Sequence, residues 1–547
     1  MALLEIKNLS FKYPLEDKYA LENISLTISE GDFLLVCGKT GCGKTTLLKL
    51  MKKELMPNGA KTGQVLFMGN SIDNNDQPQS IGYVFQNPDN QIVTDKVWHE
   101  LSFGLENLNT KVEVMNNRIA EIANFFGIDN WFYDKTANLS GGQKQILNLA
   151  SVLVMNPKVI LLDEPTSQLD PIARSNFLAL LTKINQELGI TIVLVEHNLE
   201  DVFGIVDEVL LLDSGRLLIK GLKEEVNYYI RKNNLDIREA LPSALQITNS
   251  LNLNISYFVK DARQALINNY FNVNCKMSYK VPILSEDTVI DCKNIFYSYD
   301  RKKQDILNNL NIKVLKGEIL TVLGSNGSGK TTLLNVISGV IKPYSGRIFI
   351  NGKKIKEYKN NSLYINNLTV LPQNPLNVFL KKRVIDDLND SLLIGGSSEE
   401  DKNEIIDIFQ LKSYLYSHPF DLSGGEVQKC ALAKILLLKP KIMLLDEPTK
   451  GLDAFAKKQL INILKRLQLD GVTIVIVTHD IEFSAAISDR IAMLFDGRVN
   501  NPTNIHDFFS NNILYTTKAS LISKNFYQNT VTNQELIALA LENGLKK

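Results

Sequence analysis

The sequence has no apolar run of about 18 residues, and its N-terminus lacks a basic region followed by a long apolar stretch. We therefore expect no membrane-spanning helix, so any membrane-spanning part would belong to another subunit. The five cysteines are scattered and never spaced as CxxC, which argues against a disulfide framework or a zinc site. Such a set is typical of a reducing cytosol.

An excess of charge of one sign is also lacking. Lys and Arg together number 60, Asp and Glu together number 60, and no long block of like charge occurs. Proteins that bind nucleic acid or anionic membranes usually display a basic surface. We therefore expect no nucleic-acid partner.

A long internal repeat is the main feature of this 547-residue chain. Three motifs occur twice: GKTGCGKT and GSNGSGKT at 38–45 and 324–331, LSGGQ and LSGGE at 139–143 and 422–426, and LLDEPT at 161–166 and 444–449. The second copies follow the first by 286, 283 and 283 residues. A fixed offset of this kind indicates two homologous halves.

Short apolar runs indicate the fold of each half. DFLLVCG, KVILLDEP and TIVLVEH are continuous and apolar, as in strands buried on both faces of a parallel sheet. KTTLLKLMKKEL and GGQKQILNLASVLVM have apolar residues at helical spacing. Their alternation predicts an α/β fold with a mainly parallel sheet, in which ligands bind beyond the carboxyl ends of the strands.

The glycine-rich motif predicts ATP binding. GxxxxGK[ST] between a strand and a helix brings backbone N–H groups to phosphate oxygens at a helix N-terminus. We expect Lys44 and Lys330 to reach the β- and γ-phosphates, and Thr45 and Thr331 to bind Mg²⁺. A chance match has a probability on the order of 10⁻², so two in register disfavour an ordinary turn. The remaining predicted nucleotide-binding residues of these loops are Gly38, Gly41, Gly43, Thr46, Gly324, Gly327, Gly329 and Thr332.

Paired acids follow the second apolar strand of each half. A buried carboxylate at a strand end is costly unless it meets a cation or a donor, and a magnesium ion would remove that cost. We predict that Asp163 and Asp446 bind the metal, and that Glu164 and Glu447 polarise the attacking water. The alternative is a capping Asp beside a solvated Glu.

The LSGG motifs carry a family resemblance. A serine followed by two glycines at a helix start makes an anion site. From these residues the sequence resembles the ABC ATPases. This resemblance implies two P-loop domains, each with a mainly parallel sheet, an antiparallel β portion and a helical signature subdomain. It also implies that the signature residues face the γ-phosphate held by the opposite half: Ser140, Gly141, Gly142, Ser423, Gly424 and Gly425.

Two further pairs match the family pattern. Gln86 and Gln373, each followed by Asn-Pro, resemble the Q-loop glutamine that contacts the metal and the attacking water. His197 and His479 resemble the switch histidine that hydrogen-bonds the γ-phosphate. We therefore count these four residues among the catalytic set.

Two tyrosines and three histidines have weaker assignments. Tyr13 and Tyr299 both precede their glycine loop by 25 residues, where an aromatic ring would stack on adenine. Packing of each ring on its own sheet is the alternative. His99, His418 and His506 are interpreted as surface or structural residues.

The two halves predict an intramolecular head-to-tail pair. Two ATP molecules would each lie between one half's phosphate loop and the other half's signature serine. The first site would then combine Lys44 with Ser423, and the second Lys330 with Ser140. Lys450 replaces the usual serine after the second acidic pair, and Glu196 precedes the first switch histidine, so the two sites differ in detail.

The stretch YVFQNPDNQIVTDKVWHELSFGLENL at 83–108 carries a subtype resemblance. It is similar to the ATPases of energy-coupling factor importers, which take up vitamins and transition-metal ions. The resemblance implies a coupling subunit and a substrate-binding subunit in the membrane, with this chain on the cytoplasmic face. The second half lacks the DNQ and FGxEN elements of this stretch.

We predict four regions. These are a first nucleotide-binding domain at 1–225, a linker with a small helical appendage at 226–287, a second domain at 288–500 and a C-terminal helical appendage at 501–547. DARQALINNY and NQELIALALENG supply the helical patterns of the two appendages.

Two other functions remain open from the sequence. A tandem ATPase of a sugar importer has the same architecture, but commonly carries one degraded site, and neither half is degraded here. A ribosome-associated ABC-F factor also has two such halves, joined by a highly charged helical hairpin. The linker here is not strongly basic.

Overall fold

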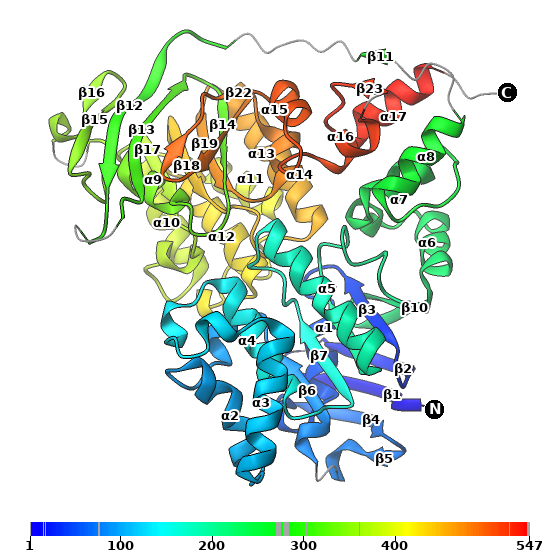
Figure 1. Ribbon diagram of the computed structural model, residues 1–547. Helices are drawn as coiled ribbons and strands as arrows, with labels where there is room; N and C mark the ends of the chain where they lie inside the picture. Colours follow the sequence, from blue (N-terminus) through cyan, green and yellow to red (C-terminus); the bar gives the residue numbers. More distant parts are fainter. Residues whose placement is uncertain are drawn as a thin grey trace. The chain divides into compact units, whose positions relative to one another are not determined.

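The chain forms two compact units, residues 1–242 and 243–547. The computed structural model describes residues 2–14, 16, 18–74, 77–269, 275–276, 284–300, 304–359, 362–524 and 526–543 (Figure 1). Tyr270 and Gly544, the ends of the two predicted appendage helices, lie outside these residues.

A mainly parallel sheet forms the centre of the first unit, with the strand order β10-β9-β3-β8-β7-β6. Its strands are β3 (Phe33–Gly38), β6 (Ile81–Val84), β7 (Val159–Asp163), β8 (Thr191–Val195), β9 (Glu208–Asp213) and β10 (Arg216–Leu222). Only the β9–β10 pair is antiparallel among these described strands. All side chains of β3, β7 and β8 are buried, which explains their continuous apolar sequences.

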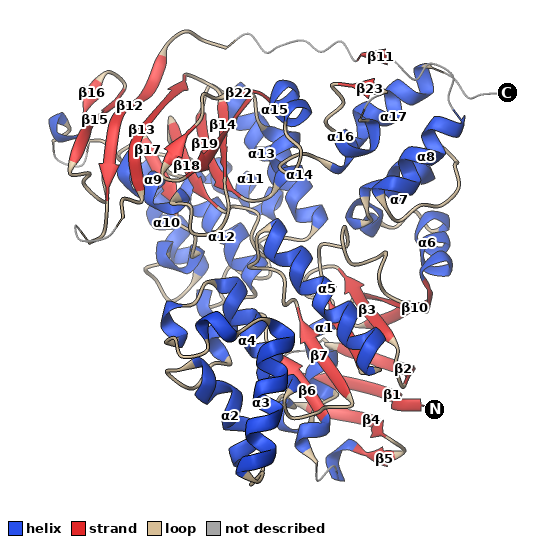
Figure 2. Cartoon of the chain, viewed as in Figure 1, coloured by secondary structure: helices blue, strands red, loops and turns tan. Residues whose placement is uncertain are grey.

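An antiparallel sheet and a helical region complete this unit (Figure 2). The sheet has the order β2-β1-β4-β5, from β1 (Ala2–Lys12), β2 (Leu21–Ser29), β4 (Ala60–Phe67) and β5 (Asn70–Ser71). The helices are α1 (Lys44–Leu50), α2 (Val97–Asn107), α3 (Val112–Phe126), α4 (Gly141–Leu153), α5 (Pro171–Leu188) and α6 (Lys223–Lys232). The helical pattern predicted to continue from Lys44 to Leu55 is interrupted, since α1 ends at Leu50 and a short 3₁₀ turn covers Lys53–Leu55.

The second unit repeats this architecture. Its mainly parallel sheet has the order β17-β18-β19-β14-β20-β21, with β22 also paired to β20. The strands are β14 (Ile319–Leu323), β17 (Leu368–Leu371), β18 (Ile442–Asp446), β19 (Thr473–Thr478), β20 (Arg490–Phe495), β21 (Arg498–Val499) and β22 (Thr503–Asn504). The antiparallel sheet β13-β12-β15-β16 consists of β12 (Thr288–Tyr297), β13 (Leu307–Leu315), β15 (Ser345–Ile350) and β16 (Lys353–Lys354). The predicted fold class is therefore confirmed in both halves.

The helices of the second unit fall into a nucleotide-domain set and an appended set. The first set is α9 (Lys330–Ile337), α10 (Val384–Gly395), α11 (Glu399–Phe409), α12 (Gly424–Leu436), α13 (Ala454–Leu469) and α14 (Ile481–Ile487). The appended set is α7 (Ser243–Ser250), α8 (Val259–Asn269), α15 (Ile505–Asn511), α16 (Lys518–Ser523) and α17 (Asn533–Glu542). No helix that the structure describes combines the length and apolarity needed to cross a bilayer.

The appended helices from the linker and from the C-terminal region share one small core. Side chains of α7, α8, α16 and α17 are buried together, and β11 (Cys275–Lys276) pairs in parallel with β23 (Tyr527–Gln528). The buried members of this core are Ala244, Ile247, Leu251, Ala262, Leu266, Ala519, Ile522, Phe526, Tyr527, Leu536 and Ala540. The predicted linker at 226–287 is thus divided, because residues 226–242 belong to the first unit and residues from 243 onward to the second.

Candidate nucleotide sites

The two glycine loops join the central strand of each sheet to a helix. Gly43 and Gly329, which precede α1 and α9, have φ angles of 101° and 99°, a conformation that side chains strongly disfavour. A Cβ atom on Gly43 would also lie 2.5 Å from the carbonyl oxygen of Ala20. The motif therefore needs glycine here, and the bare backbone suits close approach by phosphate oxygens.

The loop lysines are buried and bent back over their loops. Lys44 Nζ donates to the carbonyl oxygens of Gly38 at 2.9 Å and Lys39 at 2.8 Å. Lys330 Nζ makes the equivalent bonds to the first two residues of its loop, at 2.8 and 3.0 Å. Both side chains are less than a tenth exposed. An ammonium group buried among neutral carbonyls favours an anionic ligand.

The two aspartates lie beside the loop threonines, as a magnesium site requires. Thr45 Oγ1 donates to Asp163 Oδ1 at 3.0 Å, and the Thr331 side chain hydrogen-bonds Asp446. Burial raises the pKa of both carboxyl groups, that of Asp446 to about 6. Asp446 Oδ1 is buried without a hydrogen-bond partner. A buried oxygen in this position, next to a threonine hydroxyl, fits the oxygen ligand set that Mg²⁺ prefers.

Glu164 contacts both other predicted catalytic residues of the first half. Its carboxylate accepts a hydrogen bond from Gln86 Nε2 at 2.8 Å and pairs with His197 Nε2 at 2.6 Å. Burial alone would raise the pKa of Glu164, but His197 and Lys44 outweigh burial and lower it. The structure thus brings three predicted catalytic residues of this half together around an ionised carboxylate.

Glu447 has a different set of neighbours in the second half. It pairs with His479 Nδ1 at 3.0 Å, accepts from Thr478 Oγ1 at 2.8 Å and lies 3.6 Å from Lys330 Nζ. Burial is again outweighed by these donors, so the pKa of Glu447 lies below its usual value. Within the part of the chain that the structure describes, no hydrogen bond joins Gln373 to Glu447.

Both glutamates adopt a strained backbone. Their φ angles are 46° and 49°, in the left-handed region that side chains seldom occupy. In each half the backbone N–H donates to the neighbouring strand, Glu164 to Val195 O at 3.0 Å and Glu447 to Val477 O at 2.9 Å. Strain of this kind persists only where surrounding contacts fix the residue, and it is concentrated at functional sites.

The signature serines begin α4 and α12. Ser140 accepts from Gln143 N at 3.3 Å, and Gln143 Oε1 accepts from Ser140 N at 2.9 Å, which forms a capping box. Ser423 N donates to Glu426 at 2.8 Å. Both serines are exposed, with glycine amides behind them, so each helix start is open to an anion.

Helix α4 also holds the Gln86 loop. Gln145 Nε2 donates to the carbonyl oxygen of Phe85 at 3.2 Å, and Asn148 Nδ2 donates to that of Pro88 at 3.1 Å. A movement of the signature helix would therefore move the loop that carries Gln86. In the second half, Gln428 at the position of Gln145 donates instead to the carbonyl oxygen of Pro448 at 3.0 Å, in the turn after Glu447.

The two tyrosines lie beside the helices that follow the glycine loops. Tyr13 and Thr46 hydroxyls are 3.0 Å apart, and Tyr299 and Thr332 hydroxyls 3.3 Å apart. Each ring also packs edge-on against an aromatic neighbour on its own strand or loop, at 5.0 and 5.1 Å between centroids. Tyr299 is 65% exposed. The adenine assignment remains a prediction.

Sequence reasoning missed several residues at these sites. Tyr83 donates its hydroxyl to Asp163 Oδ2 at 3.2 Å, whereas Val370 occupies the matching place in the second half. Thr478 reaches Glu447, and Glu196 replaces it in the first half. The sequence marked Glu196 as a difference between the halves, and an alignment would have marked Tyr83 as well, but only the structure shows what each side chain contacts.

Comparison with known proteins decides the family. A family model described as ABC transporter matches residues 21–167 and 307–450, once in each half. The chain belongs to the ABC transporter family. The predicted ATPase activity and the ABC resemblance are thereby confirmed, and ATP is the nucleotide.

Relatives of this ABC ATPase extend over almost its whole length. A protein of Bacillus thuringiensis subsp. konkukian assigned as an ABC transporter ATP-binding protein is 40% identical over 94% of both chains. A Bacillus subtilis relative assigned as the HMP/thiamine import ATP-binding protein YkoD is 28% identical over 96% of both. The solved archaeal ribosome recycling factor aABCE1 covers 92% of this chain with a TM-score of 0.59, and its 20% identity shows a shared fold alone.

Proposed function

We propose that this ABC ATPase couples ATP binding and hydrolysis to import through separate membrane subunits, in an energy-coupling factor importer of a vitamin or a transition-metal ion. The observation that carries the proposal is a set of exposed apolar side chains on α2 and on the segment before it, which Gln91 joins to the Gln86 loop by accepting from Phe85 N. Trp98, Phe103 and Val93 are 38%, 41% and 64% exposed there. Exposed aromatic residues beside a nucleotide-sensing loop favour a docking surface for a partner subunit.

The relative YkoD gives independent support for import. Its assigned role concerns HMP and thiamine, and the similarity to this chain includes the linker as well as both nucleotide domains. A vitamin-type cargo is therefore our proposal for the transported class. A coupling subunit and a substrate-binding subunit in the membrane would complete the assembly, with this ATPase bound peripherally at its cytoplasmic face.

The chemistry proposed for each half follows from its contacts. Glu164 and Glu447 would polarise the attacking water, and His197 and His479, which contact them, would hydrogen-bond the γ-phosphate. Asp163 with Thr45, and Asp446 with Thr331, would hold Mg²⁺, which neutralises charge on the β- and γ-phosphates when bound. Lys44 and Lys330 would exchange their loop carbonyls for phosphate oxygens.

We further propose that the two halves pair head to tail, so that Ser423 completes the Lys44 site and Ser140 completes the Lys330 site. The serine caps of α4 and α12 support this, because both serine side chains are exposed. Ser423→Arg should then impair nucleotide hydrolysis at the Lys44 site. A loss confined to the Lys330 site would refute the crossed arrangement.

Reconstitution tests the transport role. The native complex is purified from membranes through a tag on this chain, and ATP-driven uptake is measured in vesicles. Trp98→Asp with Phe103→Asp should abolish copurification of membrane subunits while leaving the chain's melting temperature unchanged. Tyr133→Asp, at an 80% exposed position of the same unit, is the control. Cosedimentation of a Glu164→Gln, Glu447→Gln variant with ribosomes, and no membrane partner, would favour the translation-factor alternative.

A further inference from the structure

The switch histidines are carried on short loops that are tied to the helix following each acidic pair. Helices α5 and α13 begin at equivalent places, capped by Asp170 and Asp453. Arg174 and Lys457 each follow the capping aspartate by four residues. They are equivalent positions, since the offset between them is the 283 residues that relate the two halves. Both cationic side chains point to the loop that holds the switch histidine.

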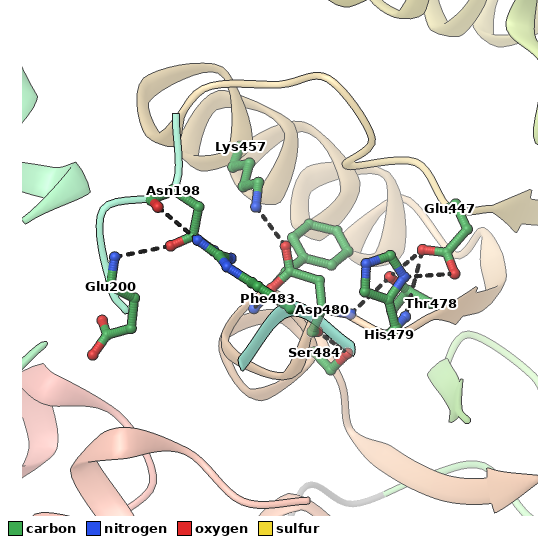
Figure 3. A network of polar contacts seen from close by, with 10 residues as sticks. Asn198, Glu200, Glu447, Lys457, Thr478, His479, Asp480, Phe483 and Ser484 are labelled. Atoms are coloured by element: carbon green, nitrogen blue, oxygen red, sulfur yellow. Dashed lines mark hydrogen bonds and ion pairs between the residues drawn. The ribbon is translucent and has the colours of Figure 1, made fainter. Parts of the chain in front are cut away.

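In the second half the tie is an ion pair. Lys457 Nζ lies 2.6 Å from Asp480 Oδ2, next to His479 in the sequence (Figure 3). The other oxygen of Asp480 caps α14 by accepting from Phe483 N at 3.1 Å. Burial raises the pKa of Asp480, but the Lys457 ammonium outweighs burial and lowers it, so the pair is ionised.

The backbone of Asp480 is linked to the Glu447 carboxylate through Thr478. Asp480 N donates to Thr478 Oγ1 at 3.1 Å, and Thr478 Oγ1 donates to Glu447 Oε2 at 2.8 Å. His479, between them, faces the other oxygen of Glu447 in Figure 3. A displacement of Asp480 would therefore displace both groups that fix Glu447.

In the first half Arg174, the equivalent of Lys457, contacts the histidine loop through a different group. Arg174 Nη2 donates to the carbonyl oxygen of Asn198 at 2.6 Å, directly after His197. Arg174 Nε also lies 3.7 Å from Asp201 Oδ2, in the segment after the histidine. This half has a further acid before the histidine. Glu196, which is 3% exposed, accepts from Thr166 N at 3.1 Å and Thr166 Oγ1 at 2.7 Å, in the turn that follows Glu164. Burial raises the pKa of this carboxyl group, and the charge of Arg174 and the Thr166 hydrogen bonds oppose that effect only in part.

We propose that Arg174 and Lys457 are positioning residues for ATP hydrolysis. Each fixes the histidine loop to the helix after the acidic turn, so that the switch histidine and the strained glutamate keep one relative geometry. The inference rests on the ATPase activity alone and does not depend on the cargo. It also assigns a use to Glu196, which joins the acidic turn to the histidine loop in the half where threonine is missing.

The test uses the full chain and separates turnover from binding. Lys457→Met should lower the steady-state kcat to about half or less, while the Kd of a fluorescent ATP analogue in the presence of Mg²⁺ changes less than about twofold. Lys457→Arg should restore kcat, because it keeps the charge. Lys465→Met, at an exposed position of the same helix, is the control for the loss of a lysine.

A charge swap protects the test against misfolding. Lys457→Asp and Asp480→Lys should each lower kcat. The double variant should recover part of the loss, because the ion pair is reversed but retained while the Asp480 cap of α14 is lost. An unchanged kcat in Lys457→Met, or a loss that appears equally in nucleotide affinity, would overturn the proposal. Failure of the double variant to exceed either single variant, with melting temperatures unchanged, would overturn it as well.

The first half supplies a parallel experiment. Arg174→Met should lower kcat without changing nucleotide affinity. Arg174→Lys should recover only part of the loss, since Arg174 reaches the Asn198 carbonyl and Asp201 through different guanidinium nitrogens. Glu196→Thr introduces the residue that the second half has at this position. Glu196→Thr should lower kcat less than Arg174→Met does. A larger loss for Glu196→Thr would mean that the Glu196–Thr166 contact positions the histidine loop more strongly than the Arg174–Asn198 contact.

Discussion

The two halves of this ABC ATPase share motifs, strand order and backbone strain, yet they surround the two glutamates proposed as catalytic differently. Glu164 is contacted by Gln86 and His197, whereas Glu447 is contacted by Thr478, His479 and Lys330. The duplicated motif therefore specifies the glutamate and the switch histidine that pairs with it in each half. Their immediate hydrogen-bond partners are free to diverge, and the two sites need not turn over at equal rates.

The largest expected effect tests whether both halves are catalytic. Glu164→Gln and Glu447→Gln each retain a hydrogen-bond acceptor but remove the base, so hydrolysis at the altered site should fall about 10²–10⁴-fold. Steady-state ATPase assays with single and double variants measure this. If one single variant keeps full turnover, that half is not a working site and the comparison fails.

Removal of the loop lysines should weaken binding at one site at a time. A charge-assisted hydrogen bond contributes about 1.5–3 kcal/mol, so Lys44→Ala or Lys330→Ala should weaken ATP binding at its own site about ten- to a hundredfold. Two-site titration with a fluorescent analogue checks this. Lys53→Ala, on the exposed 3₁₀ turn after α1, is the control. An equal loss at both sites from one substitution would contradict independent loops.

Lys450, which follows the second acidic pair, should make the Mg²⁺ affinities of the two sites differ. Burial lowers the pKa of Lys450, while the nearby carboxylates Glu447 and Asp446 favour its charged form. Lys450→Ser removes a cation that competes with Mg²⁺, so the apparent Mg²⁺ affinity of the second site should rise about three- to tenfold. Ser167→Lys should have the opposite effect on the first site. Mg²⁺ titrations of nucleotide binding measure both, and unchanged titrations would remove Lys450 from the metal's surroundings.

The smallest expected effect concerns a contact found in the first half only. Tyr83→Phe leaves one oxygen of the buried Asp163 without its donor, which should cost about 1–3 kcal/mol of stability in this unit. The first transition of a urea unfolding curve measures the loss. Tyr133→Phe, at an exposed position, should leave that transition unchanged. No shift for Tyr83→Phe would mean that another donor reaches Asp163.

The fold could be predicted because its signals are local. β3, β7 and β8 are continuous apolar runs, and α4 begins at a serine with a capping glutamine three residues later. The interruption of α1 after Leu50 was not visible, since the apolar spacing continues through Leu55. The shared core of the appended helices was also missed, because its two contributing segments lie far apart in the sequence.

The sequence by itself determined the family, the two phosphate loops and the acids that follow each buried strand, since each is a short motif read within one or two elements. Only the tertiary structure decided which side chains meet the catalytic glutamates. The register of neighbouring parallel strands sets those meetings, with Asp163 beside Val195 and Asp446 beside Val477. That register places Glu196 or Thr478 next to the acidic turn from about 30 residues away, and no local pattern specifies a contact over such a separation.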